Sequence, residues 1–166
     1  MRKITAAAGS SLFFALAPGV VAGVVPWALT GWRTGHADGA WWLVRGPAAV
    51  LLAASGAVLV HAFGRFVVDG LGTPAPVAPT ARLVVGGLYR YVRNPMYLAV
   101  VAAVVGQAAL LWRPVLIGYA AGLCVLFAAF VRGYEEPALS RQFGADYAEY
   151  RADVPAWIPR RPARKP

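Results

Sequence analysis

Apolar and charged positions occur in long blocks along the chain. The charged residues are clustered, and the four stretches between the clusters are apolar and almost free of charge, at about 10–30, 43–64, 95–112 and 114–132. A helix needs about 20 apolar residues to cross ~30 Å of hydrocarbon, so this pattern predicts about four membrane-spanning helices. The last two stretches are joined only at Trp112-Arg113-Pro114, which carries one charge and predicts a tight helical hairpin.

The composition supports this all-α, integral-membrane interpretation. Of the 166 residues 59% are hydrophobic and 14% are charged, against about half and about a quarter in a typical soluble domain. A soluble fold of this size could not bury so much apolar surface, which excludes a soluble enzyme or a secreted scaffold. The single cysteine, Cys124, excludes an intramolecular disulfide and a cysteine-rich metal site. Its apolar surroundings predict a small, buried hydrophobic residue.

The basic residues predict the orientation of the chain. The net charge is +9, and most arginines and lysines precede the first span, follow the second or lie in the C-terminal tail. The other ends of the spans carry Arg33, Arg45 and Arg113. The positive-inside rule therefore places both termini and the long second loop in the cytoplasm, at the cell membrane. This charge is explained by topology and by anionic lipid head groups, so nucleic acid is not an expected partner.

The first apolar stretch has a second interpretation, as a signal peptide. Basic residues precede it, and residues 15–17 resemble a cleavage site. Its apolar run is longer than the usual 7–15 residues of a signal sequence, which favours a membrane span. Pro18 and Pro26 lie inside this run, so a kink is expected in the helix.

Two polar segments lie at the predicted cytoplasmic ends of the hairpin. In the first, residues 70–97, a Gly86-Gly87 turn is followed by polar and aromatic residues, and Pro95 fits the first turn of a helix with Asn94 as its N-cap. In the second, the adjacent acids Glu135 and Glu136 lie where the fourth helix leaves the membrane. Two acids at that level are costly unless they are solvated or paired.

The residues after this acid pair predict an amphipathic C-terminal helix at the cytoplasmic membrane surface. Residues 137–153 place apolar and aromatic side chains four, four and three positions apart. These side chains are Leu139, Phe143, Tyr147 and Tyr150.

Taken in order, these residues resemble the isoprenylcysteine carboxyl methyltransferase family, whose wider group includes phospholipid N-methyltransferases of the phosphatidylethanolamine type. The resemblance covers residues 64–159. It rests on Leu83-Val84, Gly87, Tyr89, Arg93-Asn94-Pro95-Met96-Tyr97, Glu135-Glu136, Phe143-Gly144, Tyr147, Tyr150 and Val154-Pro155.

The resemblance implies a membrane methyltransferase that uses S-adenosylmethionine, held at the cytoplasmic end of the last helices without a Rossmann domain. The implied cofactor contacts are Leu83, Val84, Tyr89, Asn94, Pro95, Met96, Tyr97, Glu135 and Glu136. Arg93 and Arg132 are the candidate catalytic residues, because a guanidinium binds a carboxylate of the cofactor or the substrate. Arg132 is displaced by one residue from the family's substrate-binding arginine, and Asn94 stands where many members have histidine. In-line methyl transfer requires no metal, so no metal site is expected.

This interpretation divides the chain into three parts: two N-terminal spans at 1–64, a methyltransferase core at 65–159 and a basic tail at 160–166. The expected acceptor is lipophilic: an isoprenylcysteine carboxylate, a phospholipid amine or a thiol. Two alternatives remain open at this point. One is an NADPH-dependent membrane reductase related to the sterol and steroid reductases, and the other is a small non-enzymatic scaffold or transport protein.

Overall fold

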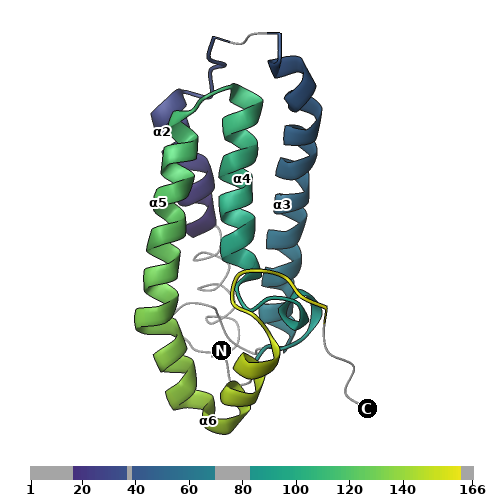
Figure 1. The fold of residues 1–166 in the computed structure, drawn as a ribbon, viewed down its shortest axis with the longest axis vertical. Helices are drawn as coiled ribbons and strands as arrows, with labels where there is room; N and C mark the ends of the chain where they lie inside the picture. Colours follow the sequence, from purple (N-terminus) through teal and green to yellow (C-terminus); the bar gives the residue numbers. More distant parts are fainter. Residues whose placement is uncertain (1–16, 37–38, 70–82, 162–166) are drawn as a thin grey trace, which may run out of the picture.

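The computed structural model describes residues 17–36, 39–69 and 83–161, and their regular structure is entirely helical (Figure 1). Two helices, Trp41–Ala62 and Val115–Asp153, are long and apolar enough to cross a membrane. Two shorter apolar helices, Ala17–Thr30 and Pro95–Leu111, stand beside them. The chain is therefore an all-helical membrane protein, as its apolar blocks predicted. Residues 10–16 of the first predicted span lie outside the described residues.

The first helix contains a π-helical turn, η1 (Val20–Val24), followed by α2 (Val25–Thr30). The N–H of Val25 bonds to the carbonyl of Val20 instead of the carbonyl four residues back, and Pro26 has no N–H to donate. The carbonyls of Val21 and Ala22 are thus left without a donor from their own helix. They accept hydrogen bonds from Tyr119 Oη (2.9 Å) and Gln107 Nε2 (2.6 Å). The π-helical turn beside Pro26 thereby connects the first helix to the hairpin through two hydrogen bonds.

The long helix α3 (Trp41–Asp69) packs closely against α4 (Pro95–Leu111). Gly106 permits this approach, because a Cβ atom there would lie 3.3 Å from the carbonyl oxygen of Ala48 and from the backbone nitrogen of Leu52. Small residues at helix interfaces allow such close packing in lipid. At the far end Trp41 Nε1 donates to the carbonyl of Leu110 at 3.1 Å.

The helices α4 and α5 (Val115–Phe130) form the predicted hairpin. Trp112, in the left-handed conformation, ends α4, and the N–H of Arg113 bonds back to the carbonyl of Ala108 at 2.9 Å. Between the two helices lies an apolar core. It consists of Val100, Val104, Ala108, Leu116, Ala120 and Leu123.

The prediction that Cys124 is buried is wrong. Cys124 is exposed on α5 beside Val125 and Leu126, which are 72% and 60% exposed. In a membrane protein an apolar outer surface is solvated by lipid, so an apolar sequence environment does not imply burial within the protein.

A second π-helical turn, η3 (Val131–Glu135), joins α5 to α6 (Glu136–Asp153). As in the first helix, the turn directly precedes a proline: the N–H of Glu136 bonds to the carbonyl of Val131, and Pro137 follows. Gly144 then breaks α6 with φ 51° and ψ −118°, a conformation open essentially only to glycine. The predicted C-terminal helix is present, and beyond Gly144 it turns back toward the end of α4 (Figure 1).

The predicted topology can be tested at two positions. His36 follows Gly35, whose N–H donates to the carbonyl of Leu111 at the C-terminal end of α4. Ala145 is on α6, at the other end of the bundle (Figure 1), and both residues are exposed. In a Cys124→Ala background, we expect His36→Cys to react with a membrane-impermeant maleimide on intact cells. Ala145→Cys is expected to react only after permeabilisation, because the positive-inside rule predicts that the basic loops face the cytoplasm. Labelling of both positions in intact cells would contradict four spans with cytoplasmic termini.

Close packing at Gly106 predicts a cost for a larger side chain. We expect Gly106→Val to reduce the free energy of unfolding by about 1–3 kcal/mol, because its methyl groups force α3 and α4 apart. The matched control is Gly122→Val on α5, where a Cβ meets nothing within 4 Å. Thermal unfolding of both variants in detergent measures the difference, and equal melting temperatures would show that the contact is not tight.

Candidate active site

The loop before α4 passes close to the end of α3. Gly87 begins the 3₁₀ turn η2 (Gly87–Arg90) with φ +60°, and a Cβ there would lie 2.8 Å from His61 Nε2. The predicted Gly86-Gly87 turn is therefore present, and glycine is required at its second position. The turn buries Tyr89, which is 5% exposed and packs with Ala62, Val84 and Met96.

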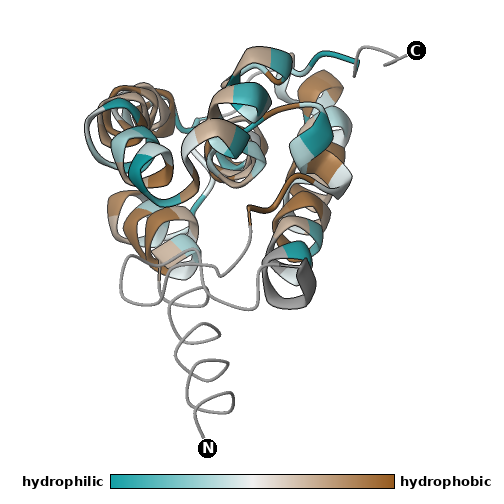
Figure 2. Ribbon diagram, turned by 90° about the horizontal axis from the view of Figure 1, so that it is seen from below, coloured by the Kyte–Doolittle hydropathy of each residue, from teal (hydrophilic) through white to brown (hydrophobic). Residues whose placement is uncertain are grey.

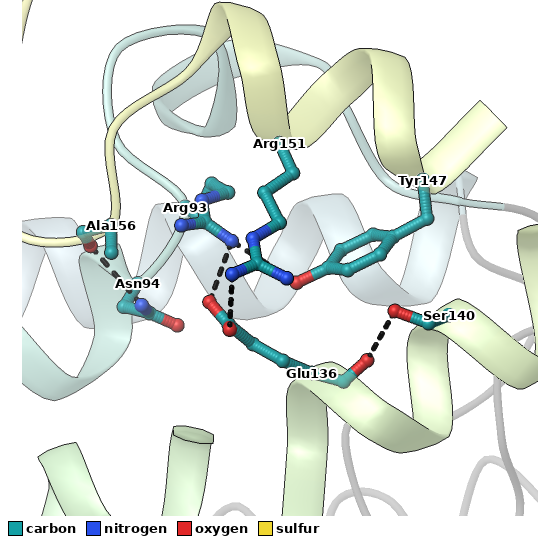
Figure 3. A network of polar contacts seen from close by, with 7 residues as sticks. All are labelled: Arg93, Asn94, Glu136, Ser140, Tyr147, Arg151 and Ala156. Atoms are coloured by element: carbon teal, nitrogen blue, oxygen red, sulfur yellow. Dashed lines mark hydrogen bonds and ion pairs between the residues drawn. The ribbon is translucent and has the colours of Figure 1, made fainter. Parts of the chain in front are cut away.

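Polar side chains from three segments meet beside this loop (Figure 3). Arg93 Nη1 lies 2.8 Å from Glu136 Oε1, and the two side chains are only 11% and 12% exposed. The same nitrogen donates to Tyr147 Oη at 3.1 Å, and Arg151 Nη2 lies 3.5 Å from Glu136 Oε2. Two guanidinium groups thus neutralise Glu136, which satisfies the requirement that a shielded acid at this level be paired.

The adjacent acid, Glu135, has a different environment. Its Oε2 accepts a hydrogen bond from Tyr97 Oη at 3.0 Å. In the part of the chain that the structure describes, no guanidinium lies within ion-pair distance of this carboxylate. Glu135 lies beyond the predicted span 114–132. Burial raises the pKa of its carboxyl group, and this effect outweighs the lowering of the pKa by the hydrogen bond from Tyr97. The two neighbouring acids therefore differ in their capacity to bind a cation.

The residues after α6 run back across this end of the bundle, and we call residues 154–160 the strap. The carbonyl of Pro155 accepts from the N–H of Arg93 (2.9 Å), and the N–H of Arg160 donates to the carbonyl of Tyr91 (3.0 Å). Next to the strap, Tyr150 Oη donates to the carbonyl of Tyr89 at 2.8 Å. Seen from this end, hydrophilic residues gather on the segments that cross the bundle (Figure 2).

Asn94 also holds the strap, which corrects its predicted role as a helix cap. It occupies the N-cap position of α4 but makes no capping hydrogen bond with its side chain. Instead Asn94 Nδ2 donates to the carbonyl of Ala156 at 3.1 Å (Figure 3). An amide supplies this donor at any pH, whereas a neutral histidine has one N–H whose position depends on its tautomer.

The structure brings most of the predicted site residues together. Arg93, Asn94, Tyr97, Glu135 and Glu136 are joined to one another or to the strap by direct contacts. The remaining predicted cofactor contacts, Leu83, Val84, Tyr89, Pro95 and Met96, are buried or half-buried in the loop and the first turn of α4.

Arg132 does not join this cluster. Its side chain is exposed on η3, and the polar contacts described for the acid pair are made by Arg93, Arg151 and Tyr97. Arg151 was not among the predicted site residues. Its position directly after Tyr150 was the only sequence signal for it.

The pattern of apolar helices with a shielded ionic cluster at one end defines an integral-membrane protein with a polar site at the end of its helical bundle. A family model of phospholipid methyltransferases matches residues 44–146, which is more than half of the chain. The chain belongs to this family, and it is therefore a membrane methyltransferase. No curated protein matches the chain, and no solved structure does.

The family match favours methyl transfer over the reductase and scaffold alternatives. It contains the loop before α4, the hairpin and both acids, and it ends before Tyr147. Tyr147 and the strap lie outside the matched residues.

The shielded ion pair predicts how the C-terminal segment is held. Arg93→Gln removes one partner and leaves Glu136 with only the more exposed Arg151, which is 55% exposed. Breaking such a pair costs about 3 kcal/mol or more. We expect amide hydrogen exchange in residues 145–161 to become roughly tenfold faster or more. The control is Arg132→Gln, and equal exchange in the two variants would show that the pair does not dock this segment.

Proposed function

We propose that the protein transfers a methyl group from S-adenosylmethionine to the amine of a phospholipid at the cytoplasmic surface of the membrane. The observation that carries this proposal is the environment of Glu135. Its carboxylate is shielded, bonded to Tyr97 and not paired with a guanidinium among the described residues. Such a group is suited to bind a cation.

The residues around Glu135 fit this cofactor. The carboxylate can accept hydrogen bonds from an ammonium group or from ribose hydroxyls, and Tyr97 and Tyr89 offer aromatic rings beside it. Leu83 and Val84 would complete the contacts from the loop. When bound, the cofactor would supply a methyl group on a sulfonium. The acceptor nitrogen would attack the methyl carbon in line, the C–S bond would break to release S-adenosylhomocysteine, and the amine proton would pass to water. In this scheme the protein holds and orients both reactants.

The pairing of Arg93 supports an amine as the acceptor. Arg93 is already bonded to Glu136 and Tyr147, so within the shielded cluster it is not available to hold an acceptor carboxylate. We propose that Arg93 is a positioning residue that docks α6, and that Arg132 binds the phosphate of the lipid head group. Arg132 is exposed on η3, one turn before the acid pair, where a head group can reach it.

The hairpin explains why the site lies at a membrane surface. Tyr97 is in the first turn of α4 and Glu135 follows α5, so the antiparallel helices bring both to one end of the bundle. A water-soluble cofactor can then enter from the cytoplasm, while a lipid acceptor arrives from the bilayer. Tyr147, Tyr150 and the strap cover this end, which limits water during transfer.

Incubation of the purified protein in lipid nanodiscs with methyl-labelled S-adenosylmethionine and a total lipid extract tests this function. We expect the label in a phospholipid, in an alkali-stable bond to nitrogen. Label in an alkali-labile methyl ester would instead identify a carboxylate acceptor. Absence of any transferred label with lipids, prenylated peptides and thiols would contradict the methyltransferase proposal.

The two acids should differ in cofactor binding. We expect Glu135→Gln to weaken S-adenosylmethionine binding by roughly tenfold or more, because a hydrogen bond to a charged group contributes about 1.5–3 kcal/mol. The matched control, Glu136→Gln, should weaken it less, since Glu136 already pairs with Arg93 and Arg151. Calorimetry measures both, and the reverse order would assign the cofactor to Glu136.

The pH dependence of binding provides a second readout of the same prediction. The pKa of Glu135 is raised from 4.5 by burial, and its ionised form is the one that attracts a cation. Wild-type affinity should therefore increase as the pH rises above 4.5 and Glu135 loses its proton. Glu135→Gln should remove this dependence. An unchanged pH profile in that variant would show that another group binds the cation.

A further inference from the structure

An aromatic side chain from the strap lies beside the Tyr97–Glu135 pair. The ring centroids of Trp157 and Tyr97 are 6.5 Å apart, and those of Tyr97 and Phe127 are 4.7 Å apart. These three rings come from the strap, α4 and α5, and the hydroxyl of the central ring donates to Glu135 at 3.0 Å. Rings from two other segments thus lie against the tyrosine that is bonded to this shielded carboxylate.

The backbone on the N-terminal side of Trp157 is held in place by hydrogen bonds. The carbonyl of Pro155 accepts from the backbone of Arg93, and the carbonyl of Ala156 accepts from the side chain of Asn94. Beyond Trp157, the N–H of Arg160 bonds to Tyr91. A half-buried indole on a segment fixed on both sides has little freedom to move away from Tyr97.

Rings next to a carboxylate favour a particular class of ligand. The face of an aromatic ring attracts a cation, and tryptophan does so most strongly. An alkylated onium cation presents mostly methyl and methylene groups, so it contacts rings better than it contacts hydrogen-bond acceptors. Arg93 and Arg151 form their ion pairs with Glu136, and among the described residues neither forms one with Glu135.

We propose that Trp157, Tyr97 and Phe127 form, with Glu135, a subsite for an alkylated onium cation, and that Asn94 is the positioning residue that holds Trp157 in it. The inference rests on the proposed methyl transfer. Two ligands share this chemistry: the sulfonium of the cofactor, and the methylated ammonium of a partly methylated acceptor. The experiment distinguishes them.

The first arm compares S-adenosylmethionine with S-adenosylhomocysteine, which lacks the methyl group and the positive charge on sulfur. If the subsite holds the sulfonium, Trp157→Leu should weaken binding of the methionine form by about 3- to 30-fold. Binding of the homocysteine form should change by less than about 2-fold. Trp157→Phe, which keeps a ring, should restore most of the difference.

The second arm uses inhibition by tetramethylammonium and by its neutral isostere neopentane, both without a phosphate. If the subsite holds the acceptor's ammonium, tetramethylammonium should inhibit the wild type more than the isostere does. Trp157→Leu should reduce the preference for tetramethylammonium over the isostere by about 3- to 30-fold. The affinities for S-adenosylmethionine and S-adenosylhomocysteine should stay unchanged. In either arm Asn94→Ala should change the selectivity for the charged ligand in the same direction as Trp157→Leu. This substitution removes the hydrogen bond to the Ala156 carbonyl, so the neighbouring Trp157 is held less firmly.

Charge selectivity separates this proposal from a structural role for Trp157. An equal loss for charged and neutral ligands, or no change in both arms, would overturn the subsite while leaving the methyltransferase proposal intact. Wild-type protein that binds no S-adenosylmethionine would overturn both. Circular dichroism and the melting temperature of each variant report whether its fold is retained, and Trp157→Phe gives the same comparison if Trp157→Leu does not fold.

Discussion

The ion pair between Arg93 and Glu136 is the interaction on which the rest of the site depends. It joins the loop before α4 to the helix after α5, and both side chains are almost shielded from solvent. A shielded carboxylate with no partner is costly, so pairing makes it possible to keep Glu136 at this level of the membrane. Arg93 and Arg151 both form ion pairs with Glu136, and neither does so with Glu135 among the described residues. One acid is thereby tied into the structure, whereas its neighbour has no ion-pair partner there and is the acid that we propose binds a cation.

Two prolines produce the irregular turns that connect this site to the bundle. In lipid every backbone polar group needs a partner within the protein, and each proline removes one donor from its helix. A π-helical turn precedes both Pro26 and Pro137. In the first helix the freed carbonyls receive the side chains of Gln107 and Tyr119. In the second, the turn ends at the acid pair, in keeping with the frequent occurrence of π turns at functional sites.

The sequence predicted the helical bundle and most of the residues that meet in the candidate site, because both depend on local signals. Charge-free runs define helices in a membrane, and an ordered set of motifs pointed to residues 93–97 and to the acid pair. The sequence did not predict contacts that depend on the path of the chain. The lipid-facing position of Cys124, the role of Asn94 in holding the strap and the place of Trp157 all require the turn at Gly144 and the packing of α5. The spacing of residues along one segment does not determine which residues of separate segments come into contact.

The different environments of the two acids also give a physical reason why the binding of a cation at Glu135 would depend on how well the strap covers this end of the bundle. Keeping the charge of Glu135 in a shielded position is unfavourable in the free protein, as its raised pKa indicates. A bound cation would offset that cost, and the gain is larger where water is excluded, because Coulombic attraction increases as the local dielectric falls. Arg93 and Asn94 hold the strap across this end of the bundle by hydrogen bonds. In the proposed mechanism, the residues that fix the C-terminal segment would therefore also influence how strongly the neighbouring acid attracts a cationic ligand.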